Sequence, residues 1–468
     1  MPDYPMLING ELVAGAKQLE VLNPATGVVF ATVERADEKM LDAAVAAAAA
    51  AQVGWAATSF DVRRAALLKL ADFVEANAAN IARMLVMEQG KPLPQAEMEV
   101  GFACQFIRYF VDQDLEPQLI QDDEQYHVEQ RFKPLGVVAA IMPWNFPFMM
   151  AIYKLAPALL MGNAVILKPS PTTPVTTLML AEPLRDLFPA GLVNIIIDQN
   201  DLGSALSGHP QVAKVSFTGS TATGRRVMEA AASSLKRLTL ELGGNDAAIV
   251  LPDADIDKTA DRAVSAAFFN AGQVCVAIKR LYVHRSIYEE MCEALAIRVQ
   301  DIIVGDGLEQ GTTMGPVQNA QQYEKLTRYL EVAERDGTII AGGQRKEGPG
   351  YFIEPTLVRD IEDGSPLVDE EQFGPVLPII AFDEVDDVIA RANASQYGLG
   401  GSVWTADADV ASSLADRLDT GTVWINHHLH FGPHIPFAGA KQSGIGSEFG
   451  REGLLEFSQR SVVNRAKN

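Results

Sequence analysis

Apolar and polar positions in the first third of the chain follow the spacing of helices. Asp61 can cap a helix that runs to about Asn77, because apolar residues recur every three or four positions after it. These apolar residues are Val62, Ala65, Leu68, Ala71 and Val74. Gly90 is expected to end the next helix, and residues 126–133 alternate as a strand does. The first third is therefore predicted to be mainly helical.

From Gly136 onward, short apolar runs alternate with helical patterns. The predicted strands are 136–142, 164–168, 193–197 and 212–217, and the predicted helices are 148–161, 173–187 and 221–235. A second series has strands at 247–250, 281–284, 377–382, 401–405 and 421–426 and helices at 256–269, 285–301, 385–394 and 407–418. Such alternation builds parallel sheets covered by helices. The sequence thus predicts two Rossmann-like α/β domains that meet at a hinge near Gly243 and Gly244.

Composition narrows the class of protein. The chain has 468 residues, 48% of them hydrophobic and 21% charged, which is typical of a globular protein with two or three domains. A net charge of −22 repels phosphate backbones and argues against nucleic-acid binding. No apolar run is long enough to span a membrane. Residues 1–5 lack the basic and apolar segments of a signal peptide, so the cytoplasm is the expected compartment.

Neither disulfides nor metal ligands are indicated by the cysteines and histidines. Cys104 and Cys292 lie in helical apolar patterns and are expected to be buried, and an odd number of cysteines does not support a disulfide framework. Four histidines crowd together near the C-terminus without the spacing of metal ligands on a helix. They are His427, His428, His430 and His434. A solvated or aromatic-lined loop is the expectation for this segment, and no metal site is expected.

Two residues in glycine-bearing segments carry the clearest chemical signal. Cys275 follows Gly272-Gln273-Val274, and Glu241 precedes Leu242-Gly243-Gly244. A thiolate is a strong nucleophile near neutral pH, and a carboxylate that does not attack can activate water. Together they indicate covalent capture of a carbonyl carbon followed by hydrolysis of the acyl group. Taken singly, Cys275 also fits a buried apolar position and Glu241 a surface charge.

Other candidate residues adjoin predicted strands, where α/β proteins place ligands. Asn145 follows a strand between Pro143 and Pro147, so a rigid loop could aim its amide at a developing oxyanion. An asparagine in an ordinary proline-bounded turn is the alternative.

The turn from Gly219 to Gly224 joins a strand to a helix, whose N-terminus suits a pyrophosphate. Ser220 could both cap this helix and touch a phosphate. The spacing is not the usual Gly-x-Gly-x-x-Gly of dinucleotide sites, so an ordinary turn is also compatible. Lys168 at a strand end could reach a ribose or a phosphate, and Glu371 precedes a rigid turn, although both also fit solvated surface positions.

In their order and spacing, these segments resemble the aldehyde dehydrogenase superfamily. The similarity runs from residues 7–11 to residues 436–444, essentially the whole chain. It implies NAD(P)-dependent oxidation of an aldehyde to a carboxylic acid. The joint presence of Asn145, Glu241 and Cys275 argues against the CoA-acylating branch, which generally lacks the glutamate, and against a non-catalytic structural descendant.

The resemblance also implies roles for individual residues. Cys275 would be the nucleophile, with a thiohemiacetal and then a thioester formed on it, and Glu241 the general base for deacylation. Asn145 and the backbone N–H of Cys275 would form the oxyanion hole, and Lys154 would lie on a proton relay. The residues that match cofactor-binding positions are Trp144, Lys168, Ser170, Gly219, Ser220, Glu371 and Phe373.

The family fold implies three parts. A dinucleotide-binding domain would comprise residues 1–115 and 135–243, and a catalytic domain residues 244–445. A small β bridging and oligomerisation element would comprise residues 116–134 and 446–468. Its C-terminal run can add a strand to a neighbour's sheet, so a homodimer or homotetramer is implied.

Two departures from the family pattern bear on specificity. Members that prefer NAD usually carry a glutamate three places after the lysine that matches Lys168, and here that place is Pro171. Both NAD and NADP are therefore expected to work, with a slight lean to NAD because no arginine follows Lys168 to hold the extra phosphate.

The segment 426–436, which should border the aldehyde entrance, is rich in histidine and lacks arginine. The residues that match the family's tunnel wall are Phe146, Met149, Tyr153, Phe431 and Phe437. Apolar walls of this kind favour medium apolar or aromatic aldehydes. A semialdehyde that carries a carboxylate is the alternative substrate class.

Overall fold

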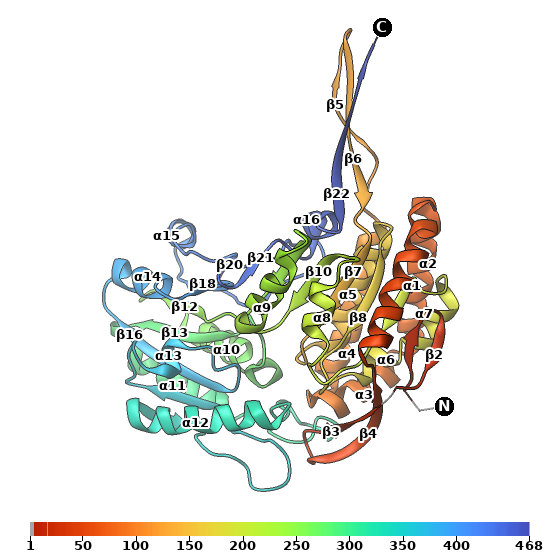
Figure 1. Cartoon of the computed structure of the whole chain (residues 1–468). Helices are drawn as coiled ribbons and strands as arrows, with labels where there is room; N and C mark the ends of the chain where they lie inside the picture. The colour runs from red at the N-terminus through yellow and green to blue at the C-terminus, as the bar shows by residue number, and fades with distance from the viewer. Residues whose placement is uncertain (1–3, 16, 114, 468) are drawn as a thin grey trace.

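The computed structural model describes residues 4–15, 17–113 and 115–467. Two large sheets with helices packed on their faces form the body, and a narrow β arm projects from it (Figure 1). Within the described residues, no helix is long and apolar enough to cross a membrane. The predicted α/β class is confirmed.

The first sheet has eight strands, in the order β2-β1-β9-β8-β7-β10-β11-β21. Its strands are β1 (Met6–Ile8), β2 (Glu11–Val13), β7 (Val137–Ile141), β8 (Ala164–Lys168), β9 (Val193–Ile195), β10 (Val212–Thr218), β11 (Arg237–Glu241) and β21 (Gly444–Ile445). The five strands from β9 to β11 are parallel, whereas β1, β2 and β21 add antiparallel edges.

Helices from the first half of the chain cover this sheet (Figure 1). They are α1 (Glu38–Ala56), α2 (Phe60–Ala76), α3 (Ala78–Gln89), α4 (Leu93–Val111), α5 (Pro147–Leu160), α6 (Val175–Leu178), α7 (Ala181–Leu187), α8 (Gly203–Gly208) and α9 (Thr221–Ala232). Every residue of α5 is buried, because α2 and α4 cover the helix on the side away from β7 and β8.

The second sheet has seven strands, in the order β14-β15-β16-β13-β12-β18-β19. Its strands are β12 (Asp246–Val250), β13 (Ile278–His284), β14 (Thr338–Ala341), β15 (Thr356–Arg359), β16 (Val376–Phe382), β18 (Gly400–Trp404) and β19 (Thr422–Ile425). Its helices are α10 (Ile256–Phe268), α11 (Tyr288–Val299), α12 (Ala320–Asp336), α13 (Pro366–Asp369), α14 (Val385–Asn393) and α15 (Ala408–Ala415). All neighbours except β14 and β15 run parallel.

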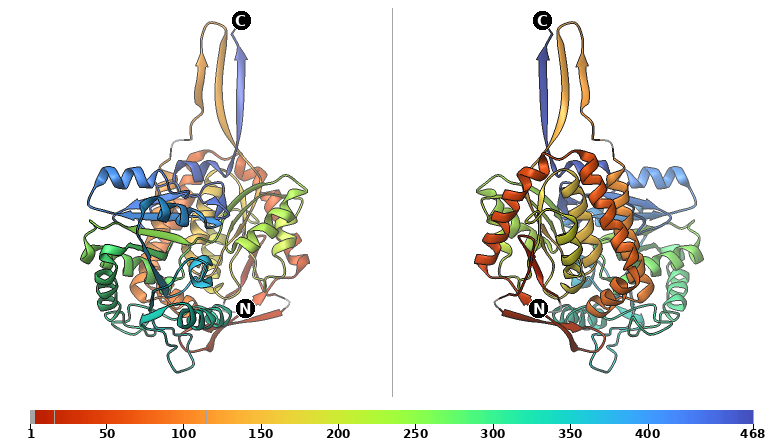
Figure 2. Two further views of the ribbon diagram at one scale, coloured as in Figure 1. Left: turned by 90° about the vertical axis from the view of Figure 1, so that its left-hand side faces the viewer. Right: turned by 90° about the vertical axis from the view of Figure 1, so that its right-hand side faces the viewer.

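The arm is a three-stranded antiparallel sheet that stands away from the body in both views of Figure 2. It consists of β5 (Gln118–Asp122), β6 (Tyr126–Pro134) and β22 (Ser458–Ala466). β22 pairs with β6 along its whole length, from Ser458 opposite Pro134 to Ala466 opposite Tyr126. Smaller elements complete the chain: β3 (Lys17–Asn23), β4 (Val28–Arg35), β17 (Tyr397–Gly398), β20 (Ala440–Lys441) and α16 (Gly450–Leu455).

Several predicted elements need correction. The cap of α2 is Ser59, whose hydroxyl accepts from the backbone N–H of Val62, and Asp61 lies in the first helical turn instead. The single helix expected at 173–187 is two short helices, because Met179 and Leu180 leave the helical ladder. The helix expected at 285–301 opens with a 3₁₀ turn and becomes α-helical only at Tyr288.

Strand β11, which ends at Glu241, was not predicted. Leu238 and Leu240 of this strand alternate with polar residues, but the run is only five residues long. The division of the chain into residues 1–115 with 135–243, 244–445, and 116–134 with 446–468 stays a prediction.

Candidate active site

Four parallel strands end at the same edge of the first sheet and bring most of the predicted site residues together. Ile141 at the end of β7 pairs with Lys168 at the end of β8 and with Phe217 of β10. Thr218 at the end of β10 pairs with Glu241 at the end of β11. Trp144, Asn145, Gly219 and Ser220 follow these ends directly. This edge is where open α/β sheets bind ligands.

The loop that carries Asn145 is held by a buried ion pair. Lys91 forms the pair with Glu99 and donates to the backbone carbonyl of Asn145 at 2.9 Å. Glu99 accepts from the backbone N–H groups of Phe148 and Met149, at 3.1 Å each, and so caps α5. Removing one partner would leave a buried charge, at a cost of about 3–5 kcal/mol in the free energy of unfolding. The loop is therefore rigid for a reason beyond its two prolines.

Asn145 is linked directly to the segment that carries the cysteine. Its buried side-chain amide donates to the backbone carbonyl of Gln273 at 3.0 Å. Asn270 donates in return to the carbonyl of Asn145 at 3.1 Å. An amide nitrogen carries two hydrogens, so one remains for an oxyanion next to Cys275.

The segment before Cys275 has an unusual backbone. Asn270 and Ala271 have φ values of 51° and 54°, and Gly272 follows with 70°. A Cβ on Gly272 would lie 2.4 Å from the carbonyl oxygen of Gly374, so glycine is required there. Lys279 fixes the backbone at Cys275 itself, because its ammonium donates to the Cys275 carbonyl at 2.7 Å. Cys275 itself keeps part of its surface exposed.

The turn after β11 meets the Cys275 backbone. A Cβ on Gly244 would lie 2.5 Å from the carbonyl oxygen of Cys275, so only glycine permits this approach. The N–H of Gly244 donates to Glu371 Oε1 at 2.9 Å. The turn therefore joins Glu241, Glu371 and Cys275 in one place.

Glu241 is a buried carboxyl group, and neither of its oxygens has a hydrogen-bond partner among the described residues. Burial is the main cause that raises its pKa well above the usual range, and Glu448 adds to the effect while Lys154 opposes it. Lys154 is fully buried, pairs with Glu448 and donates to Ser216 Oγ at 3.0 Å. The interpretation of Glu241 as a surface charge is wrong.

The thiol of Cys275 is strongly held in its protonated form. Burial raises the pKa of Cys275 to about 12; nearby Lys279 opposes the rise, and Glu241, Asp246 and Glu371 increase it. A protonated thiol must lose its proton as it attacks. The site therefore needs a base close to Cys275.

Trp144 and Phe373 come together at the mouth of this site. Their rings meet edge to face, with centroids 5.4 Å apart. Phe373 has a left-handed φ of 54°, and Gln322 holds its carbonyl oxygen at 2.9 Å. Burial raises the pKa of the neighbouring Glu371 carboxyl, and its side chain is only partly exposed, so Glu371 is not a fully solvated charge.

The remaining predicted cofactor residues lie along the sheet edge. Ser220 caps α9 by accepting from the backbone N–H of Thr223 at 3.3 Å, as predicted. Within the part of the chain that the structure describes, the Ser170 and Ser220 hydroxyls bond to Thr172 and Thr223 of their own turns rather than to the other site residues. Lys168 is buried and forms an ion pair with Asp198 at 2.6 Å, so it is not a solvated lysine.

A cavity of about 830 Å³ is lined by Phe146 and Val274, the chain neighbours of Asn145 and Cys275. Its apolar wall comprises Met98, Phe102, Phe146, Met149, Ala266, Phe269, Val274, Leu429 and Phe431. Gln95, Glu99, Asp261, Arg262, Ser265, His427, His428 and His430 complete it. Of the five expected tunnel residues, Tyr153 and Phe437 do not line this cavity, because their rings pack against Phe449.

The histidines differ from one another. His428 is buried, stacks on Trp424, and bonds to Ser402 Oγ and the Val276 carbonyl at 3.0 and 2.8 Å. Burial, followed by the charges of His430, His428 and Arg262, lowers the pKa of His427. No group of three His, Cys, Asp or Glu side chains in residues 4–15, 17–113 and 115–467 is placed to hold a metal ion.

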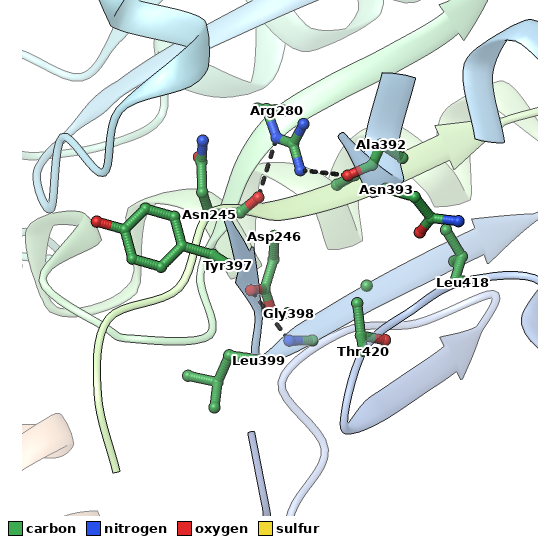
Figure 3. A pocket seen from close by; sticks show the side chains of 13 residues that line it. Asn245, Asp246, Arg280, Ala392, Asn393, Tyr397, Gly398, Leu399, Leu418 and Thr420 are labelled. Carbon is green, nitrogen blue, oxygen red and sulfur yellow. Dashed lines mark hydrogen bonds between the residues drawn. The ribbon is translucent and has the colours of Figure 1, made fainter. Parts of the chain in front are cut away.

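A second, much smaller cavity of about 10 Å³ lies at the start of β12, where Asn245 and Asp246 line it (Figure 3). Arg280 closes it by donating to the carbonyls of Asn245 and Ala392, at 2.9 and 3.2 Å. Asp246 accepts from the backbone N–H of Gly400 at 3.1 Å. This volume holds about one water molecule, so the cavity leaves no room for a substrate.

Fold and geometry thus define an α/β enzyme with a cysteine beside a buried carboxyl group. The family model for the aldehyde dehydrogenase family matches residues 12–463. Phenylacetaldehyde dehydrogenase of Pseudomonas fluorescens is 42% identical over 98% of this chain and 95% of its own length. Betaine aldehyde dehydrogenase of Rhizobium etli is 39% identical over 99% and 97%.

Solved structures agree with these matches. Betaine aldehyde dehydrogenase of Staphylococcus aureus in complex with NAD⁺ has a TM-score of 0.95 at 34% identity, covering 99% of this chain and 94% of that one. An aldehyde dehydrogenase of Bacillus cereus has a TM-score of 0.96 at 37% identity, covering 99% and 96%. The chain belongs to the aldehyde dehydrogenase family, and it is an oxidoreductase that acts on aldehydes, as predicted.

Sequence reasoning missed the residues that hold the predicted ones. Glu99 occupies an apolar face of α4 together with Ala96, Val100 and Ala103, and a glutamate on such a face signals a buried partner. Asp198, Glu448 and Arg262 carry no comparable local signal, because their partners lie far away in the chain.

Proposed function

We propose that this enzyme oxidises aldehydes by covalent catalysis at Cys275. The observation that carries the proposal is the meeting of three segments, in which Gly244 touches the Cys275 carbonyl and Asn145 holds the Gln273 carbonyl. A water molecule at the partly exposed side chain of Cys275 takes the thiol proton as the sulfur attacks the aldehyde carbon. The resulting oxyanion accepts from the Asn145 amide and the Cys275 backbone N–H. Loss of hydride converts the thiohemiacetal into a thioester. Glu241 then removes a proton from water, which attacks the thioester and releases the carboxylic acid.

Lys154 and Glu448 are proposed to carry the proton away from Glu241. Glu448 shapes the pKa of Glu241, and Lys154 is bonded to both Glu448 and Ser216. Neither Glu241 oxygen bonds to this pair among the described residues, so a bridging water would complete the path for the proton.

The hydride acceptor proposed is NAD or NADP, whose nicotinamide ring supplies the redox chemistry. The exposed N-terminus of α9, with Gly219 and Ser220, suits the pyrophosphate. Trp144 and Phe373 would border the pyrophosphate and the nicotinamide, and the predicted set of Lys168, Ser170 and Glu371 would hold the riboses. The buried carboxyl of Glu371 at the Gly244 turn fits a ribose near Cys275. NAD⁺ bound to the similar Staphylococcus aureus enzyme supports this proposal.

Medium apolar or aromatic aldehydes are the proposed substrates. Phenylalanine and methionine side chains make up most of the apolar wall of the cavity, and burial of apolar surface contributes about 25 cal/mol per Å². His427 is uncharged at neutral pH because its pKa is lowered, so it offers no cation to a carboxylate. The similarity to a phenylacetaldehyde dehydrogenase points the same way.

One observation favours the alternative, a carboxylated semialdehyde. Arg262 of α10 lines the cavity and donates to the Asn426 carbonyl, whereas the neighbouring Asp261 is paired with Arg298. An arginine at the rim could meet a distal carboxylate. Arg262 lies outside residues 426–436, the segment in which the sequence shows no arginine.

A substrate panel tests both proposals. We expect kcat/KM for phenylacetaldehyde to exceed that for succinic semialdehyde and betaine aldehyde, with reduced nicotinamide measured by absorbance. A tenfold or greater preference for succinic semialdehyde, lost in Arg262→Gln, would establish the alternative. Ser265→Ala serves as the control, because Ser265 lines the same cavity as Arg262 but carries no charge.

The assembly and the compartment complete the proposal. Exposed Leu119, Ile120 and Val462 on the arm support a homodimer or homotetramer in which the arm is an interface. The cytoplasm is the proposed location, on the sequence argument alone.

A further inference from the structure

Pro171 offers the cofactor no carboxylate, but the carboxylate of Asp198 stands beside Lys168. Asp198 follows β9, the strand that pairs in parallel with β8, so Asp198 and Lys168 emerge at the same edge of the sheet. Asp198 Oδ1 lies 2.6 Å from Lys168 Nζ, and both side chains are almost completely buried. The lysine that would reach a 2′-phosphate is therefore already neutralised.

The carboxylate is fixed in place as well as paired. Its second oxygen, Asp198 Oδ2, accepts from the backbone N–H of Leu202 at 3.0 Å. The ion pair at Oδ1 and the hydrogen bond at Oδ2 together hold this buried carboxylate in one orientation.

The same loop neutralises a second cation. Asp201 pairs with Arg35 at 2.6 Å, and Arg35 also donates to Gln199 Oε1 at 2.8 Å. This ion pair is separate from that of Lys168, because the Asp201 carboxylate is half exposed and does not touch Lys168. A 2′-phosphate beside Lys168 would be repelled by the Asp198 carboxylate, whereas an uncharged 2′-hydroxyl would not.

We propose that Asp198 makes this enzyme selective for NAD over NADP. It acts through Lys168, and it supplies the repulsion of the 2′-phosphate that Pro171 cannot supply. The proposal rests on the nicotinamide-dinucleotide site proposed above. Asp198 is a positioning residue here: it fixes and neutralises Lys168, and it opposes the extra phosphate by charge. The weak discrimination expected from Pro171 is then replaced by strong discrimination.

The first experiment compares kcat/KM for NAD and NADP at one saturating aldehyde. We expect the wild type to favour NAD by about a hundredfold or more, and Asp198→Asn to raise kcat/KM for NADP by about tenfold or more while kcat with NAD stays within about threefold. Asp198→Glu, which keeps the charge, should keep the preference. Asp201→Asn is the matched control from the same loop, because its carboxylate is half exposed and does not touch Lys168.

A second measurement needs only the wild type and isolates the adenosine end of the cofactor. AMP should inhibit competitively against NAD about tenfold more tightly than adenosine 2′,5′-bisphosphate, because a free Lys168 would give the opposite order. This measurement tests the proposal even if Asp198→Asn does not fold.

Two sets of results separate the possible failures. Equal inhibition by the two nucleotides, an NAD/NADP ratio unchanged within twofold in a folded Asp198→Asn, or an equal change in Asp201→Asn would overturn the role of Asp198. Absence of any aldehyde-dependent reduction of NAD or NADP by the wild type would instead overturn the proposed function, and the role of Asp198 with it.

Discussion

The cleft around Cys275 and the arm of β5, β6 and β22 are held together in opposite ways. In the cleft, buried side chains hold backbone carbonyl groups, as Lys91 holds Asn145 and Lys279 holds Cys275. In the arm, backbone pairing along β6 and β22 sets the geometry, and most side chains point to solvent. Single side chains therefore fix the cleft, whereas strand register fixes the arm. The effect of a substitution should differ accordingly.

The largest effect is expected from Cys275→Ala. The covalent step needs the sulfur, so aldehyde oxidation should fall below detection while NAD binding, followed by fluorescence quenching, is unchanged. Cys104→Ala is the control, since Cys104 is a buried thiol far along the chain on α4. Turnover of more than a few per cent of wild type in Cys275→Ala would show that the nucleophile is another group.

A loss nearly as large is expected from Glu241→Gln, but only in the steady state. Glutamine keeps the size of this unpartnered buried side chain and cannot accept a proton from water. Rapid mixing should therefore show a burst of reduced nicotinamide followed by very slow turnover, with acyl-enzyme visible in the intact mass. Glu229→Gln on the exposed face of α9 should behave as wild type. A missing burst would place Glu241 before hydride transfer.

Asn145→Ala should cost about 10²–10³ in kcat, the usual loss for one oxyanion donor. The variant also loses the bond to the Gln273 carbonyl, so its melting temperature must be compared with that of wild type. Asn145→Asp keeps the shape and removes the donor, and it should lose at least as much activity. A kcat within twofold of wild type in either variant would contradict the proposed donor.

The sequence points to the proposed reactive residues of the cleft more directly than to the residues that support them. Cys275, Glu241 and Asn145 stand in short glycine- or proline-marked segments, so local patterns point to them. Lys91 and Glu99 depend on a loop at residue 145, and such a meeting is visible only after folding. The contact between Asp198 and Lys168 is likewise visible only after folding, because Asp198 does not lie in the segment that follows Lys168.

The fold was predictable wherever periodicity was strong. The strand at 164–168 was predicted at its observed bounds, because its apolar run lies between clear turn signals. β11 was missed because its five residues end in a glutamate that reads as polar surface, although packing buries it. The local sequence pattern shows where a strand lies, whereas only tertiary contacts show which of its charged side chains are buried.

The pH dependence of the cleft should be steep. Burial raises the pKa of Cys275 to about 12 and that of Glu241 above its usual range, so both groups are protonated over more of the pH scale than in water. The reactive anion of each grows about tenfold per pH unit below its pKa. We therefore expect kcat/KM to rise from pH 6 to pH 9, measured with a non-ionisable aldehyde. A flat or falling profile would contradict this environment.

The smallest effect on activity is expected in the arm. Leu119 and Val462 are 61% and 58% exposed there, and each would contribute about 1.5–3 kcal/mol if a neighbouring subunit covered it. Leu119→Lys with Val462→Lys should therefore shift the mass measured by light scattering toward smaller species. Backbone pairing does not involve these side chains, so the strands should persist and kcat should stay within about twofold of wild type. Asn464→Ser on the same strand is the polar control. If the double variant keeps the mass of wild type, the arm is not the interface; if it loses activity as well, the arm supports the cleft, and the contrast between the two regions fails.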